Sequence, residues 1–111
     1  MKIETKKEKS LKDLLHDIEL EIIFWVHVLS EGSNEIKVID VMRKMNISDI
    51  RDFLHILKFL VEQEIIELIA QKTFHPERLE EYYEAIIRLK PTKEVEELIK
   101  HAKERIGLLY A

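Results

Sequence analysis

The sequence contains none or few of the residues on which several protein classes depend. It has 0 Cys among 111 residues, which excludes disulfides, thiolate metal sites and a cysteine nucleophile. Only 2 Gly and 2 Pro interrupt the chain, whereas a many-stranded β protein needs frequent turn residues of both types. The composition therefore favours a mainly α protein with long helices, and the length favours a single core.

The chain also lacks a long hydrophobic run. Its most apolar stretch, residues 18–29, is too short to cross a bilayer and includes Glu19, Glu21 and His27. The first residues, Met1 to Lys9, are charged and do not form the apolar segment of a signal peptide. We therefore expect a cytoplasmic protein.

Charged residues are plentiful, but their balance is acidic. Lys and Arg number 18 against 22 Asp and Glu, which gives a net charge of −4. Duplex DNA attracts basic surfaces, so this balance counts against nucleic-acid binding unless a dimer gathers its cations on one face. We expect residues 1–9 to form a flexible arm, which contains Lys2, Lys6, Lys7 and Lys9.

The first long helix is predicted from Leu11, capped by Ser10, to Leu29. Its apolar residues follow the three-four spacing of an amphipathic helix, and Leu20, Ile23, Phe24 and Val28 extend them around the other face. A helix that is hydrophobic all round is buried on several sides, by its own domain or by a partner subunit. Gly32-Ser33-Asn34 ends it with a turn.

The central stretch alternates short strands and helices. A strand is predicted over 34–38, a short helix over 39–45, and a left-handed turn at Asn46. A longer helix runs from Asp49 to Gln63, with Phe53, Leu57 and Leu60 on its inward face, and a second strand covers 65–70.

The C-terminal third is predicted to be helical. Pro76 opens a helix with Leu79, Tyr82, Tyr83, Ile86 and Ile87 on one face, which ends before Pro91. Thr92 caps a last helix that carries an apolar stripe from Val95 to Leu109. We expect a core over 10–75 and a dimerising helical extension over 76–111.

Two segments resemble a known family of regulators. IKVIDVMRKMNIS, which begins at Ile36, is similar to the strand and second helix of ArsR- and MarR-type regulators from archaea and bacteria. FLHILKFLVEQEIIEL, which begins at Phe53, resembles their recognition helix and first wing strand. The resemblance implies a winged helix-turn-helix with a minimal β-hairpin wing and flanking N- and C-terminal helices. Glu64 stands where that family commonly has Gly, and Gln71–Phe74 is too short for a long basic wing.

The same resemblance implies a DNA-binding surface on the helix from Asp49 to Gln63. Its stripe of Ser48, Arg51, His55 and Lys58 would lie in the major groove, with Arg51 on a guanine edge or a phosphate. The alternative is a solvated face whose charges pair locally, Asp52 with Lys58 or Arg51 with His55. Separately from the resemblance, Lys72, His75 and Arg78 at the wing either add phosphate contacts or are surface residues of a short loop. The lysines of the N-terminal arm either reach a neighbouring phosphate track or form a solubilising tail, which so short an arm favours.

No other chemistry is indicated. The five His residues are not spaced three or four apart, so they do not predict a metal site, and His27 suits a satisfied core or interface position. No phosphate-binding Gly loop or nucleophile motif is present, and Phe24, Trp25, Tyr82 and Tyr83 are interpreted as core. We therefore expect neither catalysis, nor a cofactor, nor a metal.

These observations lead to one functional prediction with two alternatives. We predict a homodimeric winged-helix protein, a transcriptional regulator or an architectural factor, that binds double-stranded DNA and dimerises through its first and last helices. The alternative is a winged-helix protein–protein interaction module, an adaptor subunit of a larger assembly, favoured by the acidic balance, Glu64 and the short wing. A third is an enzyme subunit without its own active site.

Overall fold

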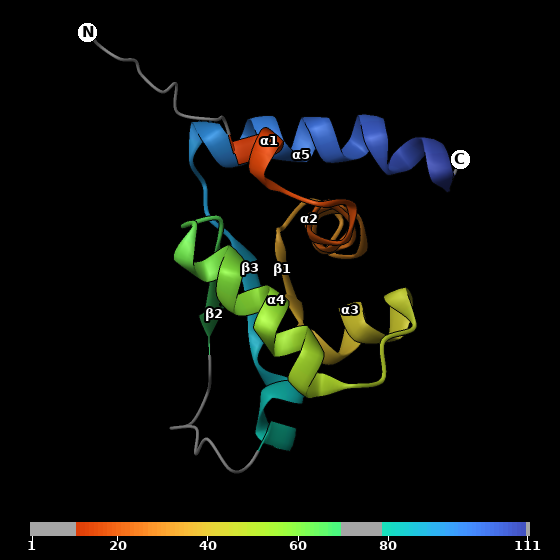
Figure 1. The fold of residues 1–111 in the computed structure, drawn as a ribbon, viewed down its shortest axis with the longest axis vertical. Helices are drawn as coiled ribbons and strands as arrows, with labels where there is room; N and C mark the ends of the chain where they lie inside the picture. Colours follow the sequence, from red (N-terminus) through yellow and green to blue (C-terminus); the bar gives the residue numbers. More distant parts are fainter. Residues whose placement is uncertain (1–10, 70–78, 111) are drawn as a thin grey trace, which may run out of the picture.

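The computed structural model describes residues 11–69 and 79–110. They form a mainly helical chain with one small antiparallel sheet (Figure 1). The elements follow the order α1 (Leu11–Leu14), α2 (Asp17–Leu29), β1 (Glu35–Lys37), α3 (Val38–Met45), α4 (Ile50–Glu62), β2 (Ile66–Ile69), η1 (Leu79–Glu84), β3 (Ile86–Leu89), α5 (Lys93–Arg105) and η2 (Gly107–Leu109).

The sheet has three strands in the order β1-β3-β2, so the last strand in sequence is the central one. Both pairings are antiparallel, and Arg88 on β3 lies opposite Glu35 of β1 and Glu67 of β2. The strands β2 and β3 are therefore the two arms of a hairpin whose connection spans residues 70–85.

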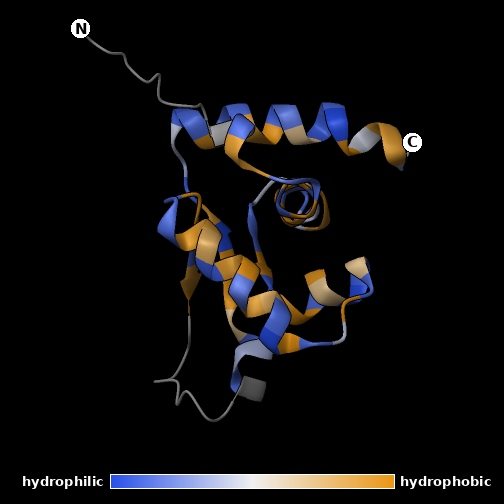
Figure 2. Cartoon of the chain, in the orientation of Figure 1, coloured by the Kyte–Doolittle hydropathy of each residue, from blue (hydrophilic) through white to orange (hydrophobic). Residues whose placement is uncertain are grey.

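The helices cover one side of this sheet. Helices α2 and α4 pack against the strands, α3 lies against α2, and α5 crosses over α2, which Figure 1 shows end-on. The side of α5 that faces away from α2 is hydrophilic (Figure 2). The buried core joins residues from every one of these layers, among them Ile22, Val41, Phe53, Ile87 and Val95.

The central stretch forms as predicted. Helix α4 begins after Asp49, whose carboxylate accepts hydrogen bonds from the backbone N–H groups of Arg51 and Asp52. Its inward residues Phe53, Leu57 and Leu60 are fully buried. Asn46 has φ 58° and ψ 40°, the left-handed conformation that ends α3.

The predicted helix from Pro76 to Pro91 is wrong. Residues 79–84 form a 3₁₀ helix and residues 86–89 form β3, the central strand. The apolar residues that suggested a helix also fit a period of two, because Ala85, Ile87 and Leu89 are buried while Ile86 and Arg88 are not. The segment interpreted as a helical extension therefore supplies the middle of the sheet.

The first helix is broken where a continuous one was predicted. Helix α1 ends at Leu14 and α2 begins after His16, which has an extended backbone and caps α2 together with Glu19. The Glu19 carboxylate accepts the backbone N–H of His16 at 2.6 Å. Leu15, at the break, is buried in the core. Ser10, the predicted cap, lies outside the described residues.

The all-round hydrophobicity of α2 is accounted for largely within one chain. Its apolar residues from Leu20 to Val26 are buried between α3, α5 and the sheet. The predicted stripe of α5 is likewise buried from Val95 to Ile106. Thr92 caps α5 as predicted, by accepting the backbone N–H of Val95. Leu109 is an exception, because α5 ends at Arg105 and Leu109 is exposed.

Candidate nucleic-acid interface

The outward face of α4 carries the predicted stripe. Arg51, His55 and Lys58 are all exposed, on the side of the helix opposite Phe53 and Leu57. Their spacing of four and three residues places them one above another along the helix. Ser48 lies in the turn between α3 and α4 and is also exposed. The structure therefore brings Arg51, His55 and Lys58 to one face of α4 and places Ser48 in the turn that precedes this helix.

The side chains of Arg51, His55 and Lys58 form no ion pair within the described part of the chain. The local pairing of Asp52 with Lys58 or of Arg51 with His55, considered above, is absent there. Asp52 is six residues from Lys58, which points the two side chains to different sides of α4. The cations of this stripe are available for an external anion.

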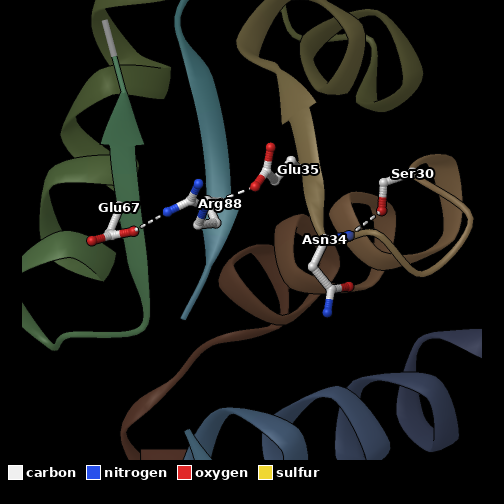
Figure 3. A network of polar contacts seen from close by, with 5 residues as sticks. All are labelled: Ser30, Asn34, Glu35, Glu67 and Arg88. Carbon is white, nitrogen blue, oxygen red and sulfur yellow. Dashed lines mark hydrogen bonds and ion pairs between the residues drawn. The ribbon is translucent and has the colours of Figure 1, made fainter. Parts of the chain in front are cut away.

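On the outer face of the sheet, by contrast, the cations are paired with carboxylates. Arg88 donates from Nε to Glu35 at 2.8 Å and from Nη1 to Glu67 at 3.2 Å, which links all three strands (Figure 3). On the same side, Lys37 pairs with Glu84 at 2.9 Å. These hydrogen bonds raise the pKa of both Arg88 and Lys37. The cations of the sheet are therefore already neutralised by the fold.

A shallow hollow of about 380 Å³ adjoins the turn at Ser48. Arg43, from the last turn of α3, lines it together with Ser48, Tyr83 and Glu84. The side chain of Arg43 is three-quarters exposed, and among the described residues its one ion pair, with Asp40, is a loose 4.0 Å contact. Sequence analysis missed Arg43 as a candidate. Its place in the last turn before the α3–α4 turn is the signal that could have identified it.

The same helix face includes acidic and apolar residues. Asp49, Asp52 and Glu62 are exposed on or beside α4, so its cations do not form an uninterrupted basic patch. Along one flank, Leu54 is half-buried and Val61 is 38% exposed. An outward side that mixes carboxylates with apolar side chains suits a protein partner better than a phosphate backbone.

Several predicted contacts cannot be placed. Lys72, His75 and Arg78, and the arm containing Lys2, Lys6, Lys7 and Lys9, lie outside the described residues. Their contribution to binding stays a prediction.

His27 has the structural role that was predicted for it. Its Nδ1 lies 2.8 Å from Oδ1 of Asn34. The backbone N–H of Asn34 donates to Oγ of Ser30 at 2.8 Å, which Figure 3 shows. These contacts fix the turn between α2 and β1. Within residues 11–69 and 79–110, no three His, Asp or Glu side chains gather in a way that could hold a metal ion. None of the helices in those ranges has the length and apolarity to cross a membrane.

Comparison of the chain with protein-family models, curated proteins and solved structures gave no match. Function is therefore inferred from the residues of this chain alone.

Proposed function

We propose that the chain is a winged-helix protein that binds double-stranded DNA through α4, as a transcriptional regulator or an architectural factor. The order of elements supports this proposal: a helix, a strand, two helices joined by a tight turn, and a β-hairpin whose second arm is the central strand. In that arrangement α4 is the recognition helix, and β2 and β3 are the strands of the wing.

The observation that carries the proposal is that Arg51 and Lys58 share one exposed face of α4 and form no ion pair within residues 11–69 and 79–110. The described cations of the sheet are bound to carboxylates of the same chain, whereas those of α4 are not. A guanidinium donates hydrogen bonds to a guanine edge or to a phosphate, and an ammonium contacts phosphate without regard to sequence. Arg43 and Ser48 line the hollow beside the α3–α4 turn and would supply further contacts there.

Two copies are needed for useful affinity. The stripe of one chain offers two permanent cations, and each phosphate contact contributes a salt-dependence slope of only about 0.9. A net charge of −4 opposes the approach of any further phosphates. A pair of chains presents the stripe twice, which is the basis for expecting a homodimer on DNA.

The test is a fluorescence-anisotropy titration of random duplex DNA at low and at physiological salt. The double variant Arg51→Gln/Lys58→Gln should weaken binding, with Arg51 contributing on the order of 1–3 kcal/mol if it reads a base. The matched control is Lys100→Gln/Lys103→Gln, which removes two exposed cations of α5 that likewise form no ion pair in the described part of the chain. If both double variants lose the same DNA affinity, the loss reflects net charge alone and there is no binding site on α4.

A second function is favoured by a separate observation, the acidic and apolar residues on the outward side of α4. Glu62 lies on the stripe face and Leu54 and Val61 lie on one flank of it, which is the kind of mixed surface that contacts another protein. If the folded protein binds no duplex at low salt, the adaptor proposal replaces the DNA proposal, with the same helix face as the contact.

A further inference from the structure

The histidines of the described chain have different surroundings, and one of them lies on the outward face of α4. Four of the five histidines fall within the described residues. His16 precedes α2, His27 contacts Asn34, and His101 is half-buried on α5. His55 is exposed on α4, in the middle of the basic stripe. It is therefore the described histidine that a ligand bound to this face would contact.

The neighbours of His55 on its own helix include both signs of charge. Arg51 precedes it by four residues and Lys58 follows it by three, so both lie beside it along α4. Asp52, three residues before His55, lies on its other flank. Within the described part of the chain, the imidazole of His55 forms no hydrogen bond and no ion pair. No described group therefore occupies its two ring nitrogens.

The elements that pack most closely against α4 are β2 and η1. The ionisable side chains that they contribute to the described residues are Glu67, Glu81, Tyr82, Tyr83 and Glu84. On the outer face of the sheet, Glu67 binds Arg88 and Glu84 binds Lys37. None of the five forms a hydrogen bond or an ion pair with His55, which lies on the side of α4 away from the core. The charge of His55 is therefore not fixed by a partner within the described fold.

We propose that His55 is a proton-dependent phosphate contact, so that DNA binding through α4 strengthens as the pH falls. A neutral imidazole has one N–H donor and no charge, whereas the protonated ring has two donors and a positive charge. This change takes place between about pH 8 and about pH 5 in histidines generally. The stripe has the two permanent cations Arg51 and Lys58, and protonated His55 adds a third. This regulation rests on the function proposed above.

One added cation changes binding strongly because the stripe contains few cations. Each phosphate contact adds about 0.9 to the slope of log affinity against log salt. At about 0.1 M salt, such a contact is worth on the order of tenfold in affinity for each bound chain. A phosphate beside the imidazole in turn favours its protonated form. Binding of DNA and binding of a proton to His55 therefore strengthen each other by the same factor.

Fluorescence-anisotropy titrations of random duplex DNA at constant ionic strength, from about pH 8 to about pH 5.5, test the proposal. In acid, the affinity of the wild type should rise on the order of tenfold for each bound chain, and its salt slope should steepen by about 0.9. His55→Gln should lose this gain. His55→Lys has a cation at residue 55 throughout the range, so near pH 8 it should bind about as tightly as the wild type binds in acid.

An effect at residue 55 must be separated from a general loss of negative charge. Each histidine that takes up a proton makes the net charge of −4 less negative, wherever that histidine lies. The matched control is His101→Gln on α5, because both single variants retain four of the five histidines. His101→Gln should keep the pH profile of the wild type. Equal flattening of the profile in both variants would overturn the proposal.

The outcomes also distinguish this proposal from the DNA proposal. Binding that depends on Arg51, but whose affinity and salt slope stay constant over this pH range, overturns the role of His55 and leaves DNA binding by α4 in place. A folded chain that binds no duplex at any pH and at low salt overturns both. A gain in acid that persists in full in His55→Gln assigns the proton to another group and overturns the proposal.

Discussion

The outer face of the sheet and the outward face of α4 are both charged, but they use their charges differently. On the sheet, Arg88 holds Glu35 and Glu67 together across three strands, and Lys37 binds Glu84. On α4, Arg51 and Lys58 have no such partner in the described part of the chain. Charges that the fold pairs internally help hold its strands together, whereas charges it leaves unpaired are available to another molecule. Substitutions on the sheet face should therefore change the stability of the fold, whereas substitutions on the outward face of α4 should change DNA binding.

The largest expected effect separates the two sides of α4 itself. Leu57→Ala should destabilise the fold by about 2–5 kcal/mol, because Leu57 is fully buried and its truncation leaves a cavity. Lys58→Ala should change the free energy of unfolding by less than about 0.5 kcal/mol, as exposed substitutions do. Chemical denaturation of the two variants measures both values. Similar losses would mean that α4 does not present Lys58 outward.

A glycine at position 64, between α4 and β2, should stabilise the fold. Glu64 has φ 62°, a left-handed conformation that strains any residue with a Cβ. Glu64→Gly should stabilise the fold by about 0.5–1 kcal/mol, the relief of strain less the added entropy of the unfolded chain. Glu64→Ala removes the same carboxylate without relieving the strain. A gain in the alanine variant as well would trace the effect to charge.

Arg88→Gln should affect stability and leave binding unchanged. Without the guanidinium, Glu35 and Glu67 remain on either side of the central strand with nothing between them to neutralise them. The thermal midpoint should fall, and the fall should shrink at high salt because both carboxylates are exposed to solvent. DNA affinity should equal that of the wild type. A loss of affinity would show that the paired sheet face also contacts the ligand.

The smallest effect concerns acid stability. Nε of Arg105 donates to Asp17 at 2.6 Å, and this hydrogen bond lowers the pKa of Asp17 below its ordinary value of 3.8. The ionised carboxylate therefore favours the folded state above pH 3.8, and this contribution is lost as the pH falls through the lower folded pKa. Thermal midpoints of wild type and Asp17→Asn should converge in that acid range. A gap between the two midpoints that stays unchanged throughout that range would contradict this role of Asp17.

Local sequence signals predicted most of the elements around α4. The structure confirms three predictions that depend on residues near one another in sequence. These are the helix cap at Asp49, the left-handed turn at Asn46 and the burial of Phe53, Leu57 and Leu60. The outward placement of Arg51, His55 and Lys58 followed from the same periodicity.

The wrongly predicted segment, residues 86–89, takes its conformation from strands that are distant in the sequence. Ile86 to Leu89 is short and apolar, and such a run fits a helix or a strand equally well. It becomes a strand because β1 and β2, from elsewhere in the chain, flank it on both edges. The ion pairs of Arg88 and the contact of Tyr110 with Glu21 also join residues far apart in sequence. No local pattern in the sequence indicates them.

The salt dependence of DNA binding tests the central claim most directly, namely that the unpaired cations of α4 contact phosphate. The slope of log affinity against log salt should be negative for the wild type and should become shallower by about 0.9 for each lost phosphate contact in each chain. Arg51→Gln/Lys58→Gln should flatten the slope, whereas Arg88→Gln should leave it unchanged. An identical slope in the wild type and the α4 double variant would contradict the account.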